Sequence, residues 1–140
     1  MLSRHSFTLL AVVLLLAVAA TPALAGKGGG GSAGGSSIEL VMVSSARADA
    51  SGPSFASQVT YAVSTGRTDR PWVSTRCYQN GKLALDDWRG MFEGYVLGRI
   101  VPLGPTANWT GGAATCTARL VSFDNGGEKT LASMSFDVAA

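Results

Sequence analysis

The chain has 140 residues, of which 46% are hydrophobic and 14% charged, and its formal net charge is +2. The basic residues are scattered singly and form no stripe that could follow a phosphate backbone, so nucleic acid is not an expected partner. A single histidine and two cysteines leave little for histidine- or thiolate-dependent catalysis, or for a zinc site.

Residues 1–25 have the pattern of a secretory signal peptide. Arg4 and His5 precede an apolar run from Phe7 to Ala20 that is short for a membrane span, and small residues allow cleavage after Ala25. We therefore expect a secreted protein, not inserted in a membrane once the signal is removed. The only histidine would leave with the signal peptide.

Residues 26–37 are almost wholly Gly, Ser and Ala, which predicts a flexible leader. Residues 38–140 then form a single domain, small enough that a covalent crosslink would add usefully to its stability. Alternating apolar and polar residues predict strands, separated by turn residues. In chain order the expected strands are 38–43, 55–64, 72–79, 82–85, 95–103, 113–123 and 130–138.

The dipeptide Asn80-Gly81 predicts a tight hairpin between the third and fourth strands, because a type I′ turn needs a positive φ at both central positions. Residues 86–95 lack a clear pattern and predict a long loop. Seven short strands without a convincing helix predict an antiparallel two-sheet sandwich, with a barrel as the structural alternative.

Cys77 and Cys116, the only cysteines, predict one disulfide bond in an exported chain. On the chain-entropy model this bond stabilises the fold by about 4 kcal/mol. With Trp72 near Cys77, and with the strand pattern Cys116-x-Ala118-x-Leu120, the domain resembles the immunoglobulin-like and fibronectin-type-III-like domains of bacterial secreted proteins. That resemblance implies the fold and no activity.

One feature departs from the immunoglobulin pattern. Immunoglobulin domains link their second and sixth strands across the two sheets, whereas the second strand here has no cysteine and Cys77 lies on the third. In that architecture the third and sixth strands are neighbours, so we expect the disulfide to lie within one sheet.

If Cys77 and Cys116 point inward, alternation turns the intervening side chains outward. A two-residue turn would also place Tyr78 opposite Leu83 and Arg76 opposite Leu85. The predicted binding face is therefore Trp72, Arg76, Tyr78, Leu83, Leu85, Arg119 and Phe123. Two alternatives stay open: a register slip or bulge would make Leu83 and Leu85 core residues, or residues 86–95 would cover the face.

The leading hypothesis is a non-catalytic module that binds a protein or a surface polymer through this face. A second hypothesis is a carbohydrate-binding module, in which Trp88 and Trp109 join Trp72 and Tyr78 as stacking platforms. A third is a glycan hydrolase that uses Asp86, Asp87 and Glu93. Residues 124–128 suit turn chemistry better than a calcium loop. We expect no catalytic residue, metal or cofactor.

Overall fold

A computed structural model describes residues 34–48 and 51–140, and the expected signal peptide and most of the expected leader lie outside these ranges. In these ranges no helix is long and apolar enough to cross a membrane. The described residues form β1 Ser37–Ser44, β2 Gln58–Ser64, β3 Trp72–Gln79, β4 Lys82–Gly90, β5 Val101–Pro102, β6 Ala114–Ser122, the short 3-10 turn η1 Asp124–Gly126 and β7 Lys129–Val138.

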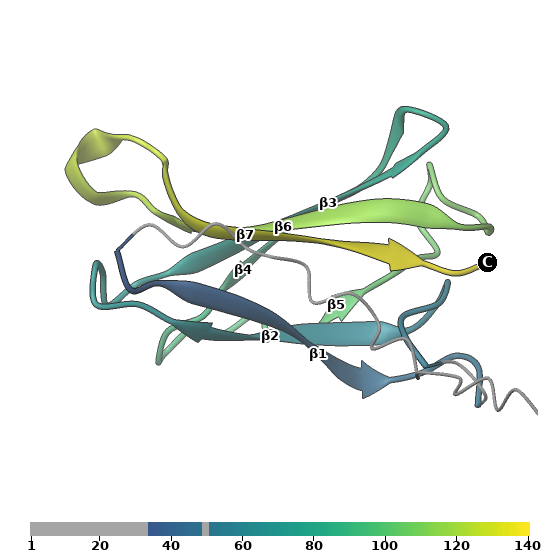
Figure 1. Cartoon of the computed structure of the whole chain (residues 1–140), viewed down its shortest axis with the longest axis horizontal. Coiled ribbons are helices and arrows are strands. Elements are labelled where there is room, and N and C mark those ends of the chain that lie inside the picture. The colour runs from purple at the N-terminus through teal and green to yellow at the C-terminus, as the bar shows by residue number, and fades with distance from the viewer. Residues whose placement is uncertain (1–33, 49–50) are drawn as a thin grey trace, which may run out of the picture.

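The strands form two antiparallel sheets that pack face to face (Figure 1). The smaller sheet has the order β1-β2-β5, and the larger sheet has the order β4-β3-β6-β7. Each sheet keeps two separate edges, so the fold is a sandwich and the barrel alternative is wrong. The prediction of an all-β, seven-strand sandwich is confirmed.

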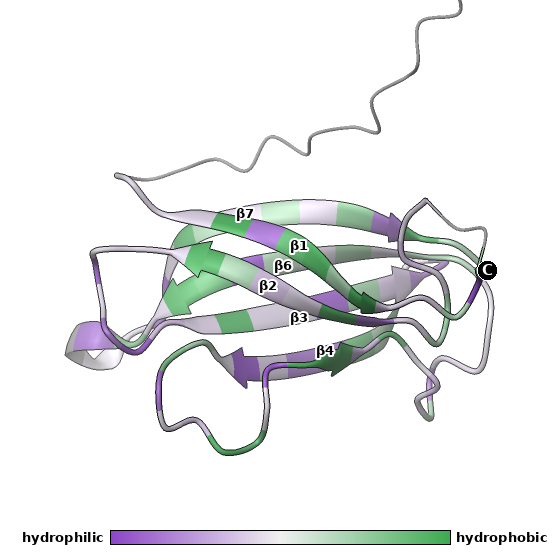
Figure 2. Ribbon diagram, turned by 90° about the horizontal axis from the view of Figure 1, so that it is seen from below, coloured by the Kyte–Doolittle hydropathy of each residue, from purple (hydrophilic) through white to green (hydrophobic). Residues whose placement is uncertain are grey.

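The core lies between the sheets and is built by alternation along the strands. At the start of β1 a green band is followed by a purple one, where buried Ile38 precedes exposed Glu39 (Figure 2). Fully buried residues at its centre include Val59, Val73, Val101 and Leu120. The sheets are also joined by a buried hydrogen bond of 2.8 Å between the hydroxyls of Tyr61 on β2 and Thr75 on β3.

The hairpin between β3 and β4 forms as predicted, with φ of 48° at Asn80 and 76° at Gly81. Tyr78 lies opposite Leu83, also as predicted. A register shift then follows, so that Arg76 lies opposite Asp86, and Leu85 lies opposite Cys77. The pairing of Arg76 with Leu85 was wrong, because the bulge in β4 adds one residue and turns Leu85 inward.

Two predicted boundaries are also wrong. β4 continues to Gly90, where a loop had been expected from residue 86, because charged and aromatic residues still alternate between its two faces. The expected strand 95–103 shrinks to the two residues of β5. Gly94 and Gly98 have φ of 80° and 76°, which breaks the extended conformation of that segment.

Cys77 and Cys116 form the predicted disulfide. They lie directly opposite each other on β3 and β6, so the bond lies within the larger sheet, as predicted. Both residues are fully buried, and the bond therefore faces the core. The residues next to each cysteine on its own strand therefore point to the outer side of the sheet.

Candidate functional site

The outer face of the larger sheet is the surface that points away from the smaller sheet. On β3 it carries Trp72, Ser74, Arg76 and Tyr78, because the residues between them point into the core. Strand pairing arranges the outer face in rows across the sheet, which are Gly90-Trp72-Val121-Thr130, Trp88-Ser74-Arg119-Ser133, Asp86-Arg76-Thr117-Ser135 and Leu83-Tyr78-Thr115-Asp137. This order places aromatic residues at one end and polar residues in the middle.

At that end lies a group of rings that we call the outer aromatic cluster. Its members are Trp72, Trp88, Phe92, Tyr95 and Phe123. The ring of Trp72 is central, with centroids 5.5 Å from Phe92, 5.3 Å from Tyr95 and 6.4 Å from Phe123. Val121 is fully buried yet lies outside the main core, in the same row as Trp72. The cluster is thus a second apolar group outside the sandwich.

Phe123, which follows the last residue of β6, is the most open member of the cluster. It is 47% exposed, and its ring lies 5.9 Å from that of Trp88 with an angle of 38° between the planes. Trp88 and Trp72 are half-buried. Phe123 is therefore the most accessible ring of the cluster, and both tryptophans keep part of their surface exposed.

The alternative in which a loop covers the face is correct in part. Phe92 and Tyr95, in the loop between β4 and β5, pack on Trp72 and cover that end of the sheet. A Cβ on Gly90 would lie only 2.6 Å from the Phe92 ring and 2.7 Å from the Tyr95 ring, so a glycine lets the loop fold back this closely. The same loop leaves Val96 and Leu97 exposed at its tip.

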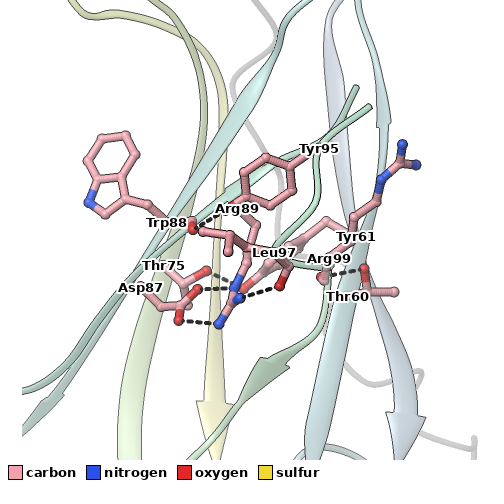
Figure 3. Close-up of polar contacts among 9 residues, drawn as sticks. All are labelled: Thr60, Tyr61, Thr75, Asp87, Trp88, Arg89, Tyr95, Leu97 and Arg99. Carbon is pink, nitrogen blue, oxygen red and sulfur yellow. Dashed lines mark hydrogen bonds and ion pairs between the residues drawn. The ribbon is translucent and has the colours of Figure 1, made fainter. Parts of the chain in front are cut away.

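An inward-facing ion pair anchors this loop (Figure 3). The Arg89 guanidinium donates to both carboxylate oxygens of Asp87, at 2.6 and 2.7 Å, and donates at 3.2 Å to the carbonyl of Leu97. Thr60 donates at 2.9 Å to the carbonyl of Arg99, which ties the far end of the loop to β2. Figure 3 shows the Trp88 ring pointing away from this pair.

The middle of the outer face is polar and internally paired. Arg76 pairs with Asp86 at 3.2 Å, and Arg119 pairs with Glu128 at 3.0 Å. The hydroxyls of Thr117 and Ser135 lie 3.3 Å apart, within hydrogen-bonding distance. These groups give the face hydrogen-bonding capacity next to its aromatic end.

At the other end of the face, Tyr78 and Leu83 are each 42% exposed. Leu83 is therefore on the face as predicted, whereas Leu85 is buried beside the disulfide and does not belong to it. Trp72, Arg76, Tyr78, Arg119 and Phe123 all lie on the side that alternation predicted.

Trp109 is not available for stacking on a sugar, and its assignment as a candidate was wrong. It is fully buried, its ring lies 5.5 Å from Phe55, and its Nε1 donates at 3.1 Å to the carbonyl of Gly112. The residue closes one end of the core, since the indole finds both an apolar contact and a hydrogen-bond acceptor there.

The three carboxylates considered for hydrolysis do not form one group. Asp86 points from the outer face toward Arg76, whereas Asp87 points from the inner side toward Arg89. Glu93 is exposed in the loop beyond β4. In the described ranges no three His, Cys, Asp or Glu side chains are grouped so that they could hold a metal ion.

Among the titratable groups, Tyr61 is strongly perturbed. Burial raises the pKa of its phenol well above the ordinary value, the nearby Asp87 carboxylate raises it further, and the hydrogen bond with Thr75 opposes both. This phenol is a neutral structural group between the sheets and does not reach the outer face.

Phe92 and Tyr95 were missed as members of the site. Their signal in the sequence was two aromatic residues shortly after Gly90, a spacing that lets a loop fold back onto a sheet.

A scan of the chain against protein-family models finds no matching family, and comparisons with curated proteins and with solved structures find no similar chain.

Proposed function

We propose that the mature chain is a secreted, non-catalytic module that binds a protein or a cell-surface polymer through the outer face of the larger sheet. The observation that carries this proposal is the outer aromatic cluster, which lies outside the core and leaves Phe123 47% exposed on a face that also carries Arg76 and Arg119. Exposed aromatic residues and arginine are enriched where proteins bind their partners.

The strand order supports an immunoglobulin-like or fibronectin-type-III-like fold of the kind found in bacterial secreted proteins. In immunoglobulin sandwiches the third strand, C, pairs with strand F and, in the variable type, lies in the same sheet as an added strand C′, opposite a sheet that contains the first two strands. The order β4-β3-β6-β7 against β1-β2-β5 fits this scheme. Such sandwiches serve mostly as rigid platforms, and their function lies in surface sites.

The proposed secretion rests on two independent features. The first 25 residues have the pattern of a signal peptide, and the Cys77–Cys116 bond is the chemistry expected in an oxidising compartment. A secreted location would bring the outer face into contact with envelope polymers or with proteins on other surfaces.

Carbohydrate binding is the second candidate, favoured by the position of two tryptophans. Trp72 and Trp88 both point to the outer face, and Trp88 adjoins the exposed ring of Phe123. Aromatic rings flanked by hydrogen-bonding side chains suit the apolar faces and hydroxyls of sugars. The proposal assigns no catalytic role to Asp86, Asp87 or Glu93, since the first two lie on opposite sides of β4.

The test is a binding screen with variants of the face. The mature chain is applied to immobilised neutral and acidic polysaccharides and to solubilised envelope proteins. Trp88→Ala and Phe123→Ala should weaken whatever binding the wild type shows by at least tenfold, as for interface residues that anchor a complex. Val41→Ala is the matched control, because Val41 is 41% exposed on the opposite sheet.

Binding that is unchanged in both aromatic variants would contradict the proposal. Binding lost in Val41→Ala would place the ligand surface on the smaller sheet instead. Circular dichroism of each variant checks that it is folded before its affinity is interpreted.

A further inference from the structure

Ser74 lies in the middle of the outer face and is only 1% exposed. Its Oγ atom is buried without a hydrogen-bond partner. Several other buried hydroxyls are bonded: Thr75 bonds to Tyr61 on the inner side, and Ser54 bonds to Ser57. An unbonded buried hydroxyl is unfavourable and uncommon in folded proteins, so its position calls for an explanation.

The side chains around Ser74 are those of the proposed binding surface. Trp88 lies directly opposite it on β4, and Arg119 lies directly opposite it on β6. Trp72 precedes it by two residues on the same face of β3. Ser74 thus lies between Trp88 and Arg119 in its row of the outer face, and it is more buried than either.

Phe123 packs against the two aromatic neighbours of Ser74. Its ring contacts those of Trp72 and Trp88, which flank Ser74 along and across the sheet. Phe123 follows the last residue of β6 and precedes the turn η1, so its backbone is not held in the sheet ladder. Nearly half of its surface is exposed, so one side of the ring faces solvent.

We propose that Ser74 is a ligand-binding hydroxyl, covered by Phe123 in the free protein, and that its ligand is a neutral polysaccharide. This inference rests on the function proposed above. When the Phe123 ring turns outward, a pyranose ring stacks between it and Trp88, and one of the sugar hydroxyls forms a hydrogen bond with Ser74 Oγ. The ligand would then give a hydrogen bond to the buried hydroxyl that, among the described residues, has no partner on this face.

The charges of the face favour a neutral ligand. Arg76 and Arg119 are each paired with a carboxylate, and the negative charge of Asp137 offsets the positive charge of Arg70, which lies over the Phe92 ring of the cluster. The face therefore has no excess of positive charge to attract a polyanion. A sugar chain offers the uncharged hydroxyls and apolar ring faces that match Ser74 and Trp88.

The test measures affinity and stability together, because a hydroxyl needed only by the ligand affects them differently. The mature chain and its Ser74→Ala variant are titrated with three soluble neutral polysaccharides: hydroxyethyl cellulose, galactomannan and starch. Carboxymethyl cellulose serves as the charged counterpart of the first. Urea unfolding of both proteins is followed in the absence of sugar.

Ser74→Ala should bind about 3- to 10-fold more weakly, the loss expected for one hydrogen bond to an uncharged partner. Its resistance to urea should be equal to or higher than that of the wild type, since the substitution removes an unbonded polar atom. Ser44→Ala is the matched control, because Ser44 is an exposed serine at the end of β1 in the smaller sheet and should change neither quantity. Carboxymethyl cellulose should bind more weakly than hydroxyethyl cellulose.

Three results would overturn the inference. If Ser74→Ala binds as tightly as the wild type while Trp88→Ala binds weakly, the binding face stands and the role of Ser74 falls. If Ser74→Ala is less stable, the hydroxyl is structural. If the wild type binds none of the neutral polysaccharides, the inferred ligand is wrong, and the binding face is then decided by the envelope-protein screen.

Discussion

Reducing the disulfide between Cys77 and Cys116 should lower the free energy of unfolding by about 4 kcal/mol. The two residues are 39 apart in the sequence, so the bond closes a long loop in the unfolded chain. On the chain-entropy model, closure of that loop removes about 13 cal/mol/K from the unfolded state, which gives this value at 25 °C. A domain of this size is stable by only about 5–15 kcal/mol, so the reduced form should be much more easily unfolded.

The assay is equilibrium urea unfolding of the oxidised protein and of protein that was reduced while unfolded and then refolded with reductant present. With a slope of about 2 kcal/mol per M, the urea midpoint should fall by about 2 M. A variant with both cysteines changed to alanine controls for the reductant, which should not affect it. A midpoint for the reduced protein within about 0.5 M of that of the oxidised protein would refute the reasoning.

Three further variants test the packing that supports the outer face. The free energy of unfolding should fall above about pH 10, by up to about 1.4 kcal/mol per pH unit, because the raised pKa keeps Tyr61 protonated in the folded state while the phenol ionises in the unfolded state. Urea unfolding measured at several pH values should show a smaller fall for Tyr61→Phe. Gly90→Ala should lower the free energy of unfolding by about 1–3 kcal/mol, because the new methyl group displaces the two rings packed against Gly90. Gly66 has open space around it, so Gly66→Ala should lower it by under about 1 kcal/mol, and thermal unfolding measures both variants. Arg89→Ala should lower the free energy of unfolding in urea by about 1.5–3 kcal/mol, because it leaves the half-buried Asp87 carboxylate unpaired. Arg76→Ala breaks a more exposed ion pair and should lower it by under about 1 kcal/mol.

Much of the outer face could be predicted because strand alternation is a strong constraint. Two cysteines that point inward fix the direction of every neighbour on β3 and β6, and so Trp72, Arg76 and Arg119 lie where alternation put them. The dipeptide Asn80-Gly81 likewise fixed the start of the β3–β4 pairing. Local rules of this kind succeed where the backbone stays regular.

Irregular backbone and long-range contacts account for what could not be predicted. The sequence contains no glycine or proline at the bulge in β4 that would predict it, yet the bulge turns Leu85 from the outer face into the core. Trp109 follows a loop sequence that suits exposure, and its burial depends on a contact with Phe55, more than fifty residues away in the chain. Likewise, Gly90 allows Phe92 and Tyr95 to fold back, but nothing local in the sequence showed that Trp72 would be the ring they pack on.

The central claim is that ligands bind the outer face of the larger sheet. The indole N–H signals of the three tryptophans test it most directly, in two-dimensional ¹⁵N NMR spectra of the mature chain titrated with the polysaccharide or envelope protein that binds best in the screen. We predict that the signals of Trp72 and Trp88 shift on binding while that of Trp109, fully buried at the end of the core, stays in place. A shift of the Trp109 signal with the other two unchanged, or no shift at saturating ligand, would contradict the claim.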